Sequence, residues 1–280
     1  MSSAGVRRVR PAVAALAAAA GVLVTVAGCS SSGSSAASSS ASPAPSATTA
    51  ASAAAAPTAS VSAAALPTVS MTPLAAASGQ LTGTQLESVL LPETDFPSGF
   101  ATSTSGPVTS GGSLTSGAAT YNLAKISCAT FVEHLGATGF GESAMVSGSV
   151  VTTLSAGQAY DQVIYQFPAA SGASGFLSGV QALGGRCASF KVKANGVNGT
   201  FSLHTAAGSP VGGHPTVELQ ETGTLGEKVN LDMLLCASGV DVFAAAGVGV
   251  SGAAAPTAPA AETIVYELMK RQAAEAVLGQ

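Results

Sequence analysis

Histidines are the residues of this 280-residue sequence best suited to acid–base or metal chemistry, and there are only three, His134, His204 and His214. A zinc site of the H-E-x-x-H type needs two histidines four residues apart on one helix. Glu133-His134 supplies part of that pattern, but no second histidine stands at the required spacing. We therefore interpret His134 as a solvated helix end and His204 as a half-exposed strand residue. His214 precedes Pro215 in an expected turn, and we predict no metal site.

The acidic residues and serines form no recognisable catalytic pattern. No Gly-x-Ser-x-Gly nucleophile elbow stands between an expected strand and a helix. Glu218 and Asp232 are expected on neighbouring strands, where two carboxyls could support a glycosidase-like reaction. We favour the simpler interpretation that they are outward polar residues of a half-solvated sheet, and we interpret Lys191 and Lys193 in the same way. We predict no catalytic residue and no enzyme activity. The same interpretation covers the other acids of the sheet region: Glu142, Asp161, Glu221, Glu227 and Asp241.

The segment Gly247 to Gly252 matches the G-x-G-x-x-G pattern of dinucleotide-binding proteins. In those proteins a helix begins at the last glycine and a parallel strand follows it. Here Pro256 and Pro259 interrupt the residues that follow. We therefore interpret the segment as a glycine-rich loop and predict no cofactor.

The N-terminus predicts export and a lipid anchor. Residues 1–10 carry three arginines and no acid, and an apolar stretch follows from Pro11 to Val26, as in a secretory signal peptide. The stretch ends in Val26-Ala27-Gly28-Cys29, which resembles the lipobox of bacterial lipoproteins. That resemblance implies cleavage after residue 28 and acylation of Cys29, with two or three acyl chains forming a stable membrane anchor. A plain signal peptide or a single-span anchor is the alternative.

The residues after Cys29 predict a disordered tether. Residues 30–79 contain no charged residue, and 43 of these 50 are Ala, Ser, Thr or Pro. Such a segment buries too little apolar surface to offset the entropy lost on folding. We expect residues 1–28 to be the signal peptide, 29–79 to be the lipidated cysteine and tether, and 80–280 to be one folded domain.

Charge and composition exclude two classes of protein. Only 9% of the residues are charged, against about 25% in an ordinary soluble domain. No dense Lys/Arg cluster is present, which argues against a nucleic-acid partner. The single apolar run at residues 11–28 rules out a polytopic membrane protein. Residues 80–280 carry 7 basic and 14 acidic residues, so the expected domain has a net charge of -7.

Hydrophobic periodicity predicts an α+β fold with an antiparallel sheet of about five to seven strands packed by three to four helices. A capping-box pattern at Thr84 to Glu87 opens the first helix, and the Asn195-Gly196 and Asn198-Gly199 pairs predict a hairpin. Residues 93–119 are rich in Gly, Ser and Thr, and we expect a long surface loop there. The expected helices span residues 84–91, 127–135, 171–183 and 260–278, and the expected strands span residues 143–154, 160–167, 187–194, 200–205, 216–222, 227–236 and 240–246.

Three cysteines remain in the expected domain, Cys128, Cys187 and Cys236, and disulfides are permitted in an exported protein. Three single pairings are open. Cys128 and Cys187 lie at the ends of expected elements, which favours their pairing over the other two. Cys236 lies inside an apolar strand and is interpreted as a buried thiol, with a reactive thiol as the alternative.

The layout resembles the extracellular sensor domain of the mycobacterial receptor kinase PknH and its relatives, many of which are actinobacterial lipoproteins. The matching residues are Leu90-Leu91, Cys128 before a short helix, the run Val163 to Pro168, Phe176 on the next helix and Cys187 after it. The resemblance implies an α+β domain with a cleft and two disulfides, and a role in sensing or binding an extracytoplasmic ligand. This chain departs from it in having Gly184-Gly185-Arg186 where the family has a tryptophan, and in lacking a second cysteine pair.

These observations favour a lipid-anchored lipoprotein at the outer face of the cell membrane, with a non-catalytic ligand-binding or sensor-like domain. Its expected partners are the membrane, through the acyl chains on Cys29, and a small molecule, an envelope polymer or a protein. The first alternative is a carrier of lipid or another hydrophobic ligand, which would need a closed apolar cavity. The second is an envelope hydrolase, which would need a histidine within hydrogen-bond reach of a serine and an acid.

Overall fold

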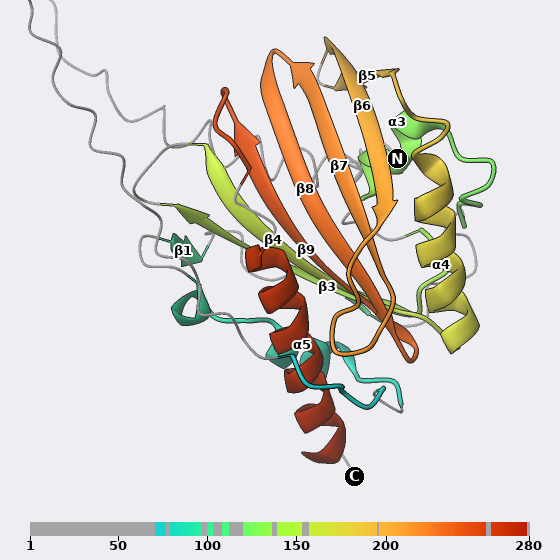
Figure 1. Ribbon diagram of the computed structural model, residues 1–280, viewed down its shortest axis with the longest axis vertical. Coiled ribbons are helices and arrows are strands. Elements are labelled where there is room, and N and C mark those ends of the chain that lie inside the picture. The colour runs from blue at the N-terminus through green and yellow to red at the C-terminus, as the bar shows by residue number, and fades with distance from the viewer. Residues whose placement is uncertain are drawn as a thin grey trace, which may run out of the picture.

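The computed structural model describes residues 71–76, 79–96, 100–102, 108–111, 120–135, 139–152, 157–194, 196–255 and 259–278. The expected signal peptide, Cys29 and most of the expected tether lie outside these residues. The described chain forms one twisted antiparallel sheet with helices against both faces (Figure 1). The predicted α+β class is therefore confirmed.

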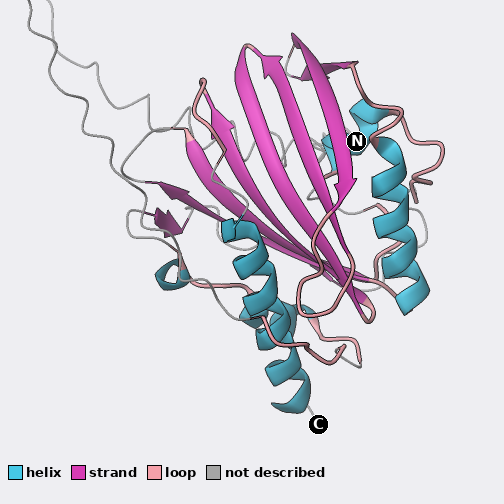
Figure 2. Cartoon of the chain, viewed as in Figure 1, coloured by secondary structure: helices cyan, strands magenta, loops and turns pink. Residues whose placement is uncertain are grey.

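The sheet runs in the order β1-β3-β4-β9-β8-β7-β6-β5, and β2 pairs with β3 beside this path. Every pairing is antiparallel. Figure 2 shows the long strands side by side across the molecule. The seven longer strands are β3 (Ala144–Thr152), β4 (Gln158–Gln166), β5 (Phe190–Ala194), β6 (Val197–Ala207), β7 (Thr216–Leu225), β8 (Glu227–Ser238) and β9 (Asp241–Val250).

Two further strands lie where the sequence predicted only a loop. Residues 93–119 include a 3₁₀ turn at Glu93–Asp95 and the short strands β1 (Phe100–Thr102) and β2 (Val108–Gly111). Both strands pair with β3, at its C-terminal and N-terminal halves respectively. Their Thr, Ser and Gly residues carry little periodic signal, because these pairings depend on the neighbouring edge strand more than on local propensity.

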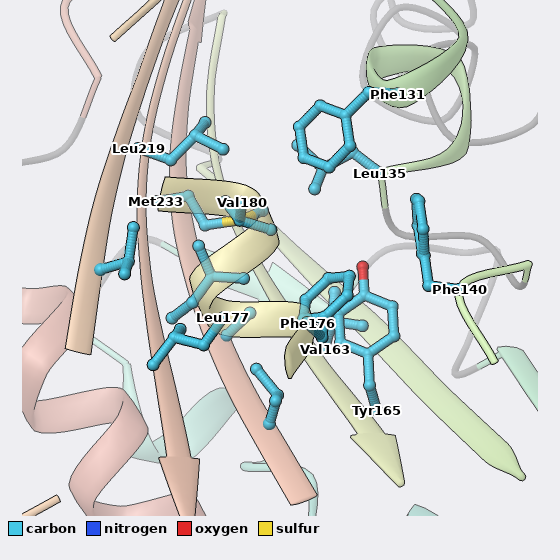
Figure 3. Close-up of a cluster of buried hydrophobic side chains, with 14 of the residues drawn as sticks. Phe131, Leu135, Phe140, Val163, Tyr165, Phe176, Leu177, Val180, Leu219 and Met233 are labelled. Carbon is cyan, nitrogen blue, oxygen red and sulfur yellow. The ribbon is translucent and has the colours of Figure 1, made fainter. Parts of the chain in front are cut away.

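Four helices of the described chain cover the two faces of the sheet: α2 (Gly83–Val89), α3 (Cys128–His134), α4 (Ala170–Leu183) and α5 (Pro259–Leu278). Alternation along each strand divides the apolar side chains between the faces. Leu219, Met233 and Tyr165 pack with α3 and α4 in one core, which Figure 3 shows in part. Leu234, Phe243 and Ile164 pack with α2 and α5 in the other.

The ends of two helices follow local capping rules. Ser127 caps α3, and its hydroxyl accepts a hydrogen bond of 3.1 Å from the Thr130 N–H. The capping box of α2 is formed by Thr82 and Gln85, two residues before the predicted one at Thr84. Thr82 has an extended backbone, whereas Thr84 already lies inside the helix, so Thr84 cannot act as its cap.

Residues 71–76, which fall within the predicted tether, contact the folded domain. The Leu74 N–H donates to the Gly212 carbonyl at 3.0 Å, and the Leu74 carbonyl lies 2.9 Å from His214 Nε2. The Thr72 hydroxyl lies 3.0 Å from the Tyr266 hydroxyl on α5. Residues 71–76 therefore pack against the described part of the domain.

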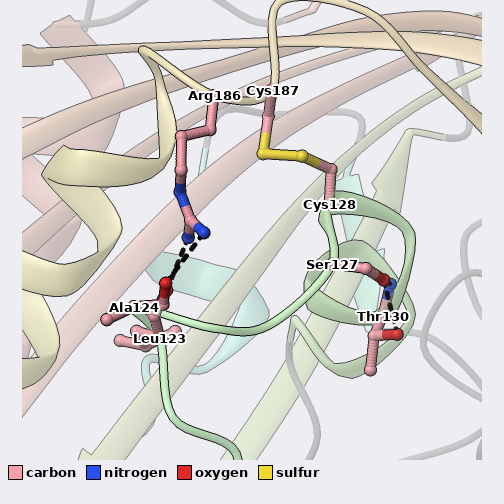
Figure 4. Close-up of a disulfide and its surroundings, with 7 residues drawn as sticks. All are labelled: Leu123, Ala124, Ser127, Cys128, Thr130, Arg186 and Cys187. Atoms are coloured by element: carbon pink, nitrogen blue, oxygen red, sulfur yellow. Dashed lines mark hydrogen bonds between the residues drawn. A yellow bond between two sulfur atoms is a disulfide. The ribbon is translucent and has the colours of Figure 1, made fainter.

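A disulfide joins Cys128, the first residue of α3, to Cys187, which follows α4 (Figure 4). The predicted pairing is thus present. Beside it the Arg186 guanidinium donates to the Leu123 and Ala124 carbonyls at 2.6 and 2.9 Å. The three bonds hold the segment before α3 against the end of α4.

Cys236 is a buried free thiol, as the apolar strand around it predicted. Its Sγ lies 3.8 Å from the Met269 Sδ on α5. Burial raises the pKa of this thiol to about 12, so it stays protonated at neutral pH and is a poor nucleophile.

Within the described residues, α5 and the other helices do not combine the length and the apolar character that crossing a membrane requires.

Candidate ligand-binding face

One part of the sheet is not covered by a helix. On the side of α2 and α5, helix α5 packs on β8 and β9, and no labelled helix lies over β5, β6 and β7 (Figure 1). We call this surface the open face. Its residues are exposed or partly exposed: Lys191, Lys193, Thr200, Ser202, His204, Glu218, Gln220, Thr222, Thr224, Lys228, Asn230 and Asp232.

Strand alternation explains why this face is polar. Phe201, Leu203 and Leu219 point into the core shared with α3 and α4. The residues between them, such as Ser202 and Gln220, must point the other way because successive side chains of a strand alternate. The open face is thus the solvated side of β5, β6, β7 and the first half of β8, whose opposite side contributes to that core.

A small pocket lies where the open face meets the first turn of α5. Its volume is about 90 Å³. Residues of β7, β8 and α5 line it, four of them polar and four apolar: Glu218, Leu219, Gln220, Asp232, Met233, Leu234, Ala261 and Glu262. The pocket therefore joins a sheet wall to a helix wall, and its walls carry three carboxyl groups.

The cross-strand register brings Glu218 and Asp232 together. Gln220 pairs with Asp232, and Glu218 is two residues away on the same strand and the same face. Diagonal neighbours of this kind have Cα atoms about 7–8 Å apart. Partial burial raises the pKa of the Asp232 carboxyl above its ordinary value. Both residues face outward, as the sequence predicted, but they also share one pocket.

Charge on the open face is divided between its two ends. Glu218, Asp232 and Glu262 surround the pocket beside α5. Lys191 and Lys228 lie at the opposite end, in one cross-strand row with Thr200 and Thr224. Hydroxyl and amide side chains separate the two ends. No salt bridge within the described chain involves Glu218, Asp232 or Glu262.

The three histidines lie on separate elements. His204 is exposed on β6 within the open face, as expected. His214 bonds the Leu74 carbonyl and lies 3.4 Å from the Ser238 hydroxyl. Among the hydrogen bonds of the described residues, none joins a histidine to a carboxylate, so the structure brings no serine–histidine–acid arrangement together there.

His134 differs from its predicted role as a solvated helix end. It is partly buried, and its Nε2 lies 2.9 Å from the Tyr121 hydroxyl. The two rings lie 4.4 Å apart between centroids, and the His134 Nδ1 is buried without a hydrogen-bond partner among the described atoms. No local pattern predicted this contact, because Tyr121 lies in a stretch before the helix that has no hydrophobic periodicity.

Three acids predicted to face outward are buried instead. Glu142 is 2% exposed, and its two carboxylate oxygens accept hydrogen bonds from the Gly139 and Phe140 N–H groups at 2.6 and 2.7 Å. Glu221 is 3% exposed, on the core side of β7 between Leu203 and Leu231. Asp241 is fully buried at the start of β9. Sequence alternation could have identified Glu221, because it continues the buried series of Val217 and Leu219.

Burial shifts the acidity of these groups. It raises the pKa of the Glu221 carboxyl to about 7 and that of Asp241 to about 6. Asp161 is partly exposed on β4, on the face that packs with α3 and α4. Desolvation raises the pKa of its carboxyl, and a hydrogen bond from the Ser149 hydroxyl lowers it in part.

The glycine pattern at residues 247–252 lies in a strand end and a turn, rather than in the predicted loop. Gly247 and Gly249 belong to β9, and residues 251–252 form the turn that follows. A Cβ on Gly249 would lie 2.4 Å from the Ala253 carbonyl oxygen. Glycine is therefore required here for close backbone packing, which accounts for part of the pattern without a nucleotide.

The described residues contain no group of three or more His, Cys, Asp or Glu placed to hold a metal ion. Three residues of the pocket were not predicted from the sequence: Gln220, Ala261 and Glu262. They line the pocket because the first turn of α5 lies beside β7 and β8, and no local sequence pattern indicates that packing.

Across the described residues, the fold and this face define a single-sheet α+β domain with one disulfide and an open polar surface. A scan of protein-family models and a search of curated proteins gave no match. Among solved structures, the chain is similar to the crystal structure of the extracellular domain of PknH from Mycobacterium tuberculosis, with a TM-score of 0.46 and 15% sequence identity. The similarity covers 69% of this chain and 97% of that chain.

Proposed function

We propose that this protein is a lipoprotein of the outer face of the cell membrane, anchored through Cys29, whose domain binds a partner without catalysis on the open face. The N-terminal pattern from Arg7 to Cys29 supports the anchor. The pocket beside α5, with the uncovered polar strands leading to it, is the observation that supports binding.

The size of the pocket indicates how a partner would bind. Pockets that enclose small-molecule ligands typically measure about 300–1,000 Å³. A pocket of 90 Å³ can accept one functional group, so the rest of the partner would lie along the exposed strands. A carrier of acyl chains needs a larger, apolar cavity, and this pocket does not favour that alternative.

The charge of the pocket indicates which group would enter it. Three carboxyls line it, and no salt bridge in the described chain neutralises them. An ammonium or guanidinium group of the partner would complete these ion pairs. The proposed partner is therefore an extended molecule with cationic groups, such as a basic segment of an envelope protein.

Binding of tetralysine to the mature protein tests this proposal by calorimetry at low ionic strength. We expect the double variant Glu218→Gln/Asp232→Asn to bind about tenfold more weakly, because each partly screened ion pair contributes up to about 1 kcal/mol. Glu133→Gln on α3, across the sheet, is the matched control and should bind as the wild type does. Equal affinity of the double variant and the control would refute the open-face site.

A second prediction concerns the anchor. Cys29→Ala removes the proposed acylation site, so we expect the protein to move from the membrane fraction to the medium. Circular dichroism of the released protein should match that of the wild type, since Cys29 lies far from the domain in sequence. Continued membrane retention of the variant would show that the lipid anchor is wrong.

A further inference from the structure

A cluster of buried polar side chains lies where α5 meets the sheet. Asp241 begins β9 and is fully buried. Its cross-strand neighbours are Gln166 on β4 and Ser238 on β8, which are 1% and 4% exposed. Gln272 of α5, also 1% exposed, donates a hydrogen bond from its Nε2 to the Asp241 Oδ2. One carboxyl group therefore links the helix to the ends of three neighbouring strands, β4, β8 and β9.

This cluster is incompletely hydrogen-bonded. The Asp241 Oδ1 and the Gln166 Nε2 are buried without a hydrogen bond of good geometry among the described atoms. Gln272 and Gln166 nevertheless favour the charged carboxylate, and desolvation by burial outweighs them. A buried acceptor without a partner costs free energy, and the cost is far greater when the group carries a charge. A proton on Asp241 removes the charge, so the compact arrangement favours the protonated carboxyl.

No cation compensates the charge of Asp241 within the described contacts. The groups that face it are neutral: Gln166 from β4, Ser238 from β8 and Gln272 from α5. Two titratable groups lie beyond Ser238. His214 Nε2 is 3.4 Å from the Ser238 hydroxyl, and Cys236, two residues before Ser238 on the same face of β8, is a neutral thiol with a pKa of about 12. The charged side chains of α2 and α5 lie exposed or bond elsewhere: Glu87 is exposed, Glu275 is partly exposed, Lys270 bonds Glu267, and Arg271 bonds the Leu90 carbonyl.

Helix α5 connects this cluster to the candidate pocket. Gln272 lies in the C-terminal half of the helix, and Ala261 and Glu262 of its first turn form one wall of the pocket. A 20-residue helix moves largely as one element, so a change in how Gln272 is held also affects the position of that wall.

We propose that protonation of Asp241 controls how tightly α5 is held on the sheet. The protonated carboxyl keeps the helix packed, and the ionised carboxylate favours local opening of the helix. If the open face binds a partner as proposed above, the same proton would also affect the pocket wall. The helix motion itself does not depend on that function.

Hydrogen exchange of the α5 amides tests this inference on the mature protein without a ligand. The pKa of Asp241 is about 6 in the packed state and 3.8 when solvated. A group with a raised pKa stabilises the packed state below its solvated pKa and loses that effect as pH rises through the higher value. Between pH 5 and pH 8 we expect protection of α5, corrected for intrinsic exchange rates, to fall about tenfold.

Two variants make the result specific. Asp241→Asn keeps the shape and the acceptor for Gln272 but cannot ionise, so protection of α5 should no longer depend on pH. Glu221→Gln removes another buried acid on the opposite face and should leave the pH dependence of α5 unchanged. If Asp241→Asn does not fold, the carboxyl carbon resonance of Asp241 in the wild type should titrate with the same midpoint as the protection of α5.

Equal protection at both pH values in the wild type would overturn the inference, as would an unchanged pH dependence in Asp241→Asn. Because no ligand is present, failure here is distinct from failure of the open-face binding test. Tetralysine affinity measured at pH 5 and pH 8 then addresses the pocket wall separately.

Discussion

Replacing both Cys128 and Cys187 by alanine is expected to lower the free energy of unfolding by about 4 kcal/mol. The two cysteines are 59 residues apart, and a cross-link over a loop of that length removes much of the entropy of the unfolded chain. The bond also ties the start of α3 to the end of α4, two helices of the same core. Urea denaturation of the variant and the wild type measures the difference.

A matched control separates the cross-link from the loss of sulfur. Cys236→Ala removes the free thiol and keeps the Cys128–Cys187 disulfide. Reducing that disulfide in this variant should therefore lower its free energy of unfolding by about the same 4 kcal/mol. A loss below about 1 kcal/mol in the Cys128→Ala/Cys187→Ala variant would contradict the structural role of the disulfide.

Glu221→Gln is expected to raise the free energy of unfolding by about 3 kcal/mol at pH 8. At pH 4, loss of the ionisable carboxyl should change that free energy little. Burial raises the pKa of Glu221 from 4.5 to about 7. The folded state therefore holds a proton that the unfolded state releases between these values, so wild-type stability falls as pH rises from about 4.5 to 7. The pKa of Glu221 in the folded state is thus about 2.5 higher than in the unfolded state. This difference corresponds to about 3 kcal/mol in the free energy of unfolding.

Unfolding curves from pH 4 to pH 8 measure this effect. Glu218→Gln is the matched control, because it lies on the same strand, is exposed and points to the opposite face. Its stability should follow the wild-type pH dependence, whereas the curve of Glu221→Gln should be flatter. Parallel curves for all three proteins would mean that Glu221 is not buried in the folded state.

The longer elements could be predicted because their own residues encode them. In β8, Leu231, Met233 and Leu235 alternate with polar residues at its start, and the strand forms where expected. Ala194 pairs with Val197 around the predicted turn, and Gly196 there has a φ of 81°, which glycine accommodates without strain. The Cys128–Cys187 pairing followed from the positions of these elements.

The candidate site could be predicted only in part. Glu218 and Asp232 were placed correctly as a pair on neighbouring strands, but Glu262 lies about 30 residues further along the chain. Its position depends on how α5 packs, and periodicity indicates which side of a helix is buried without showing what lies beside its first turn. The same limit applies to Asp241, whose burial comes from the helix that covers it.

Mapping the binding surface tests the central claim most directly. We expect tetralysine, titrated into isotopically labelled mature protein, to shift the backbone amide resonances of β7, β8 and the first turn of α5, with Glu218, Asp232 and Glu262 among the most affected residues. Shifts confined to the α3–α4 side of the sheet, or no saturable shifts, would contradict a cation-binding site on the open face.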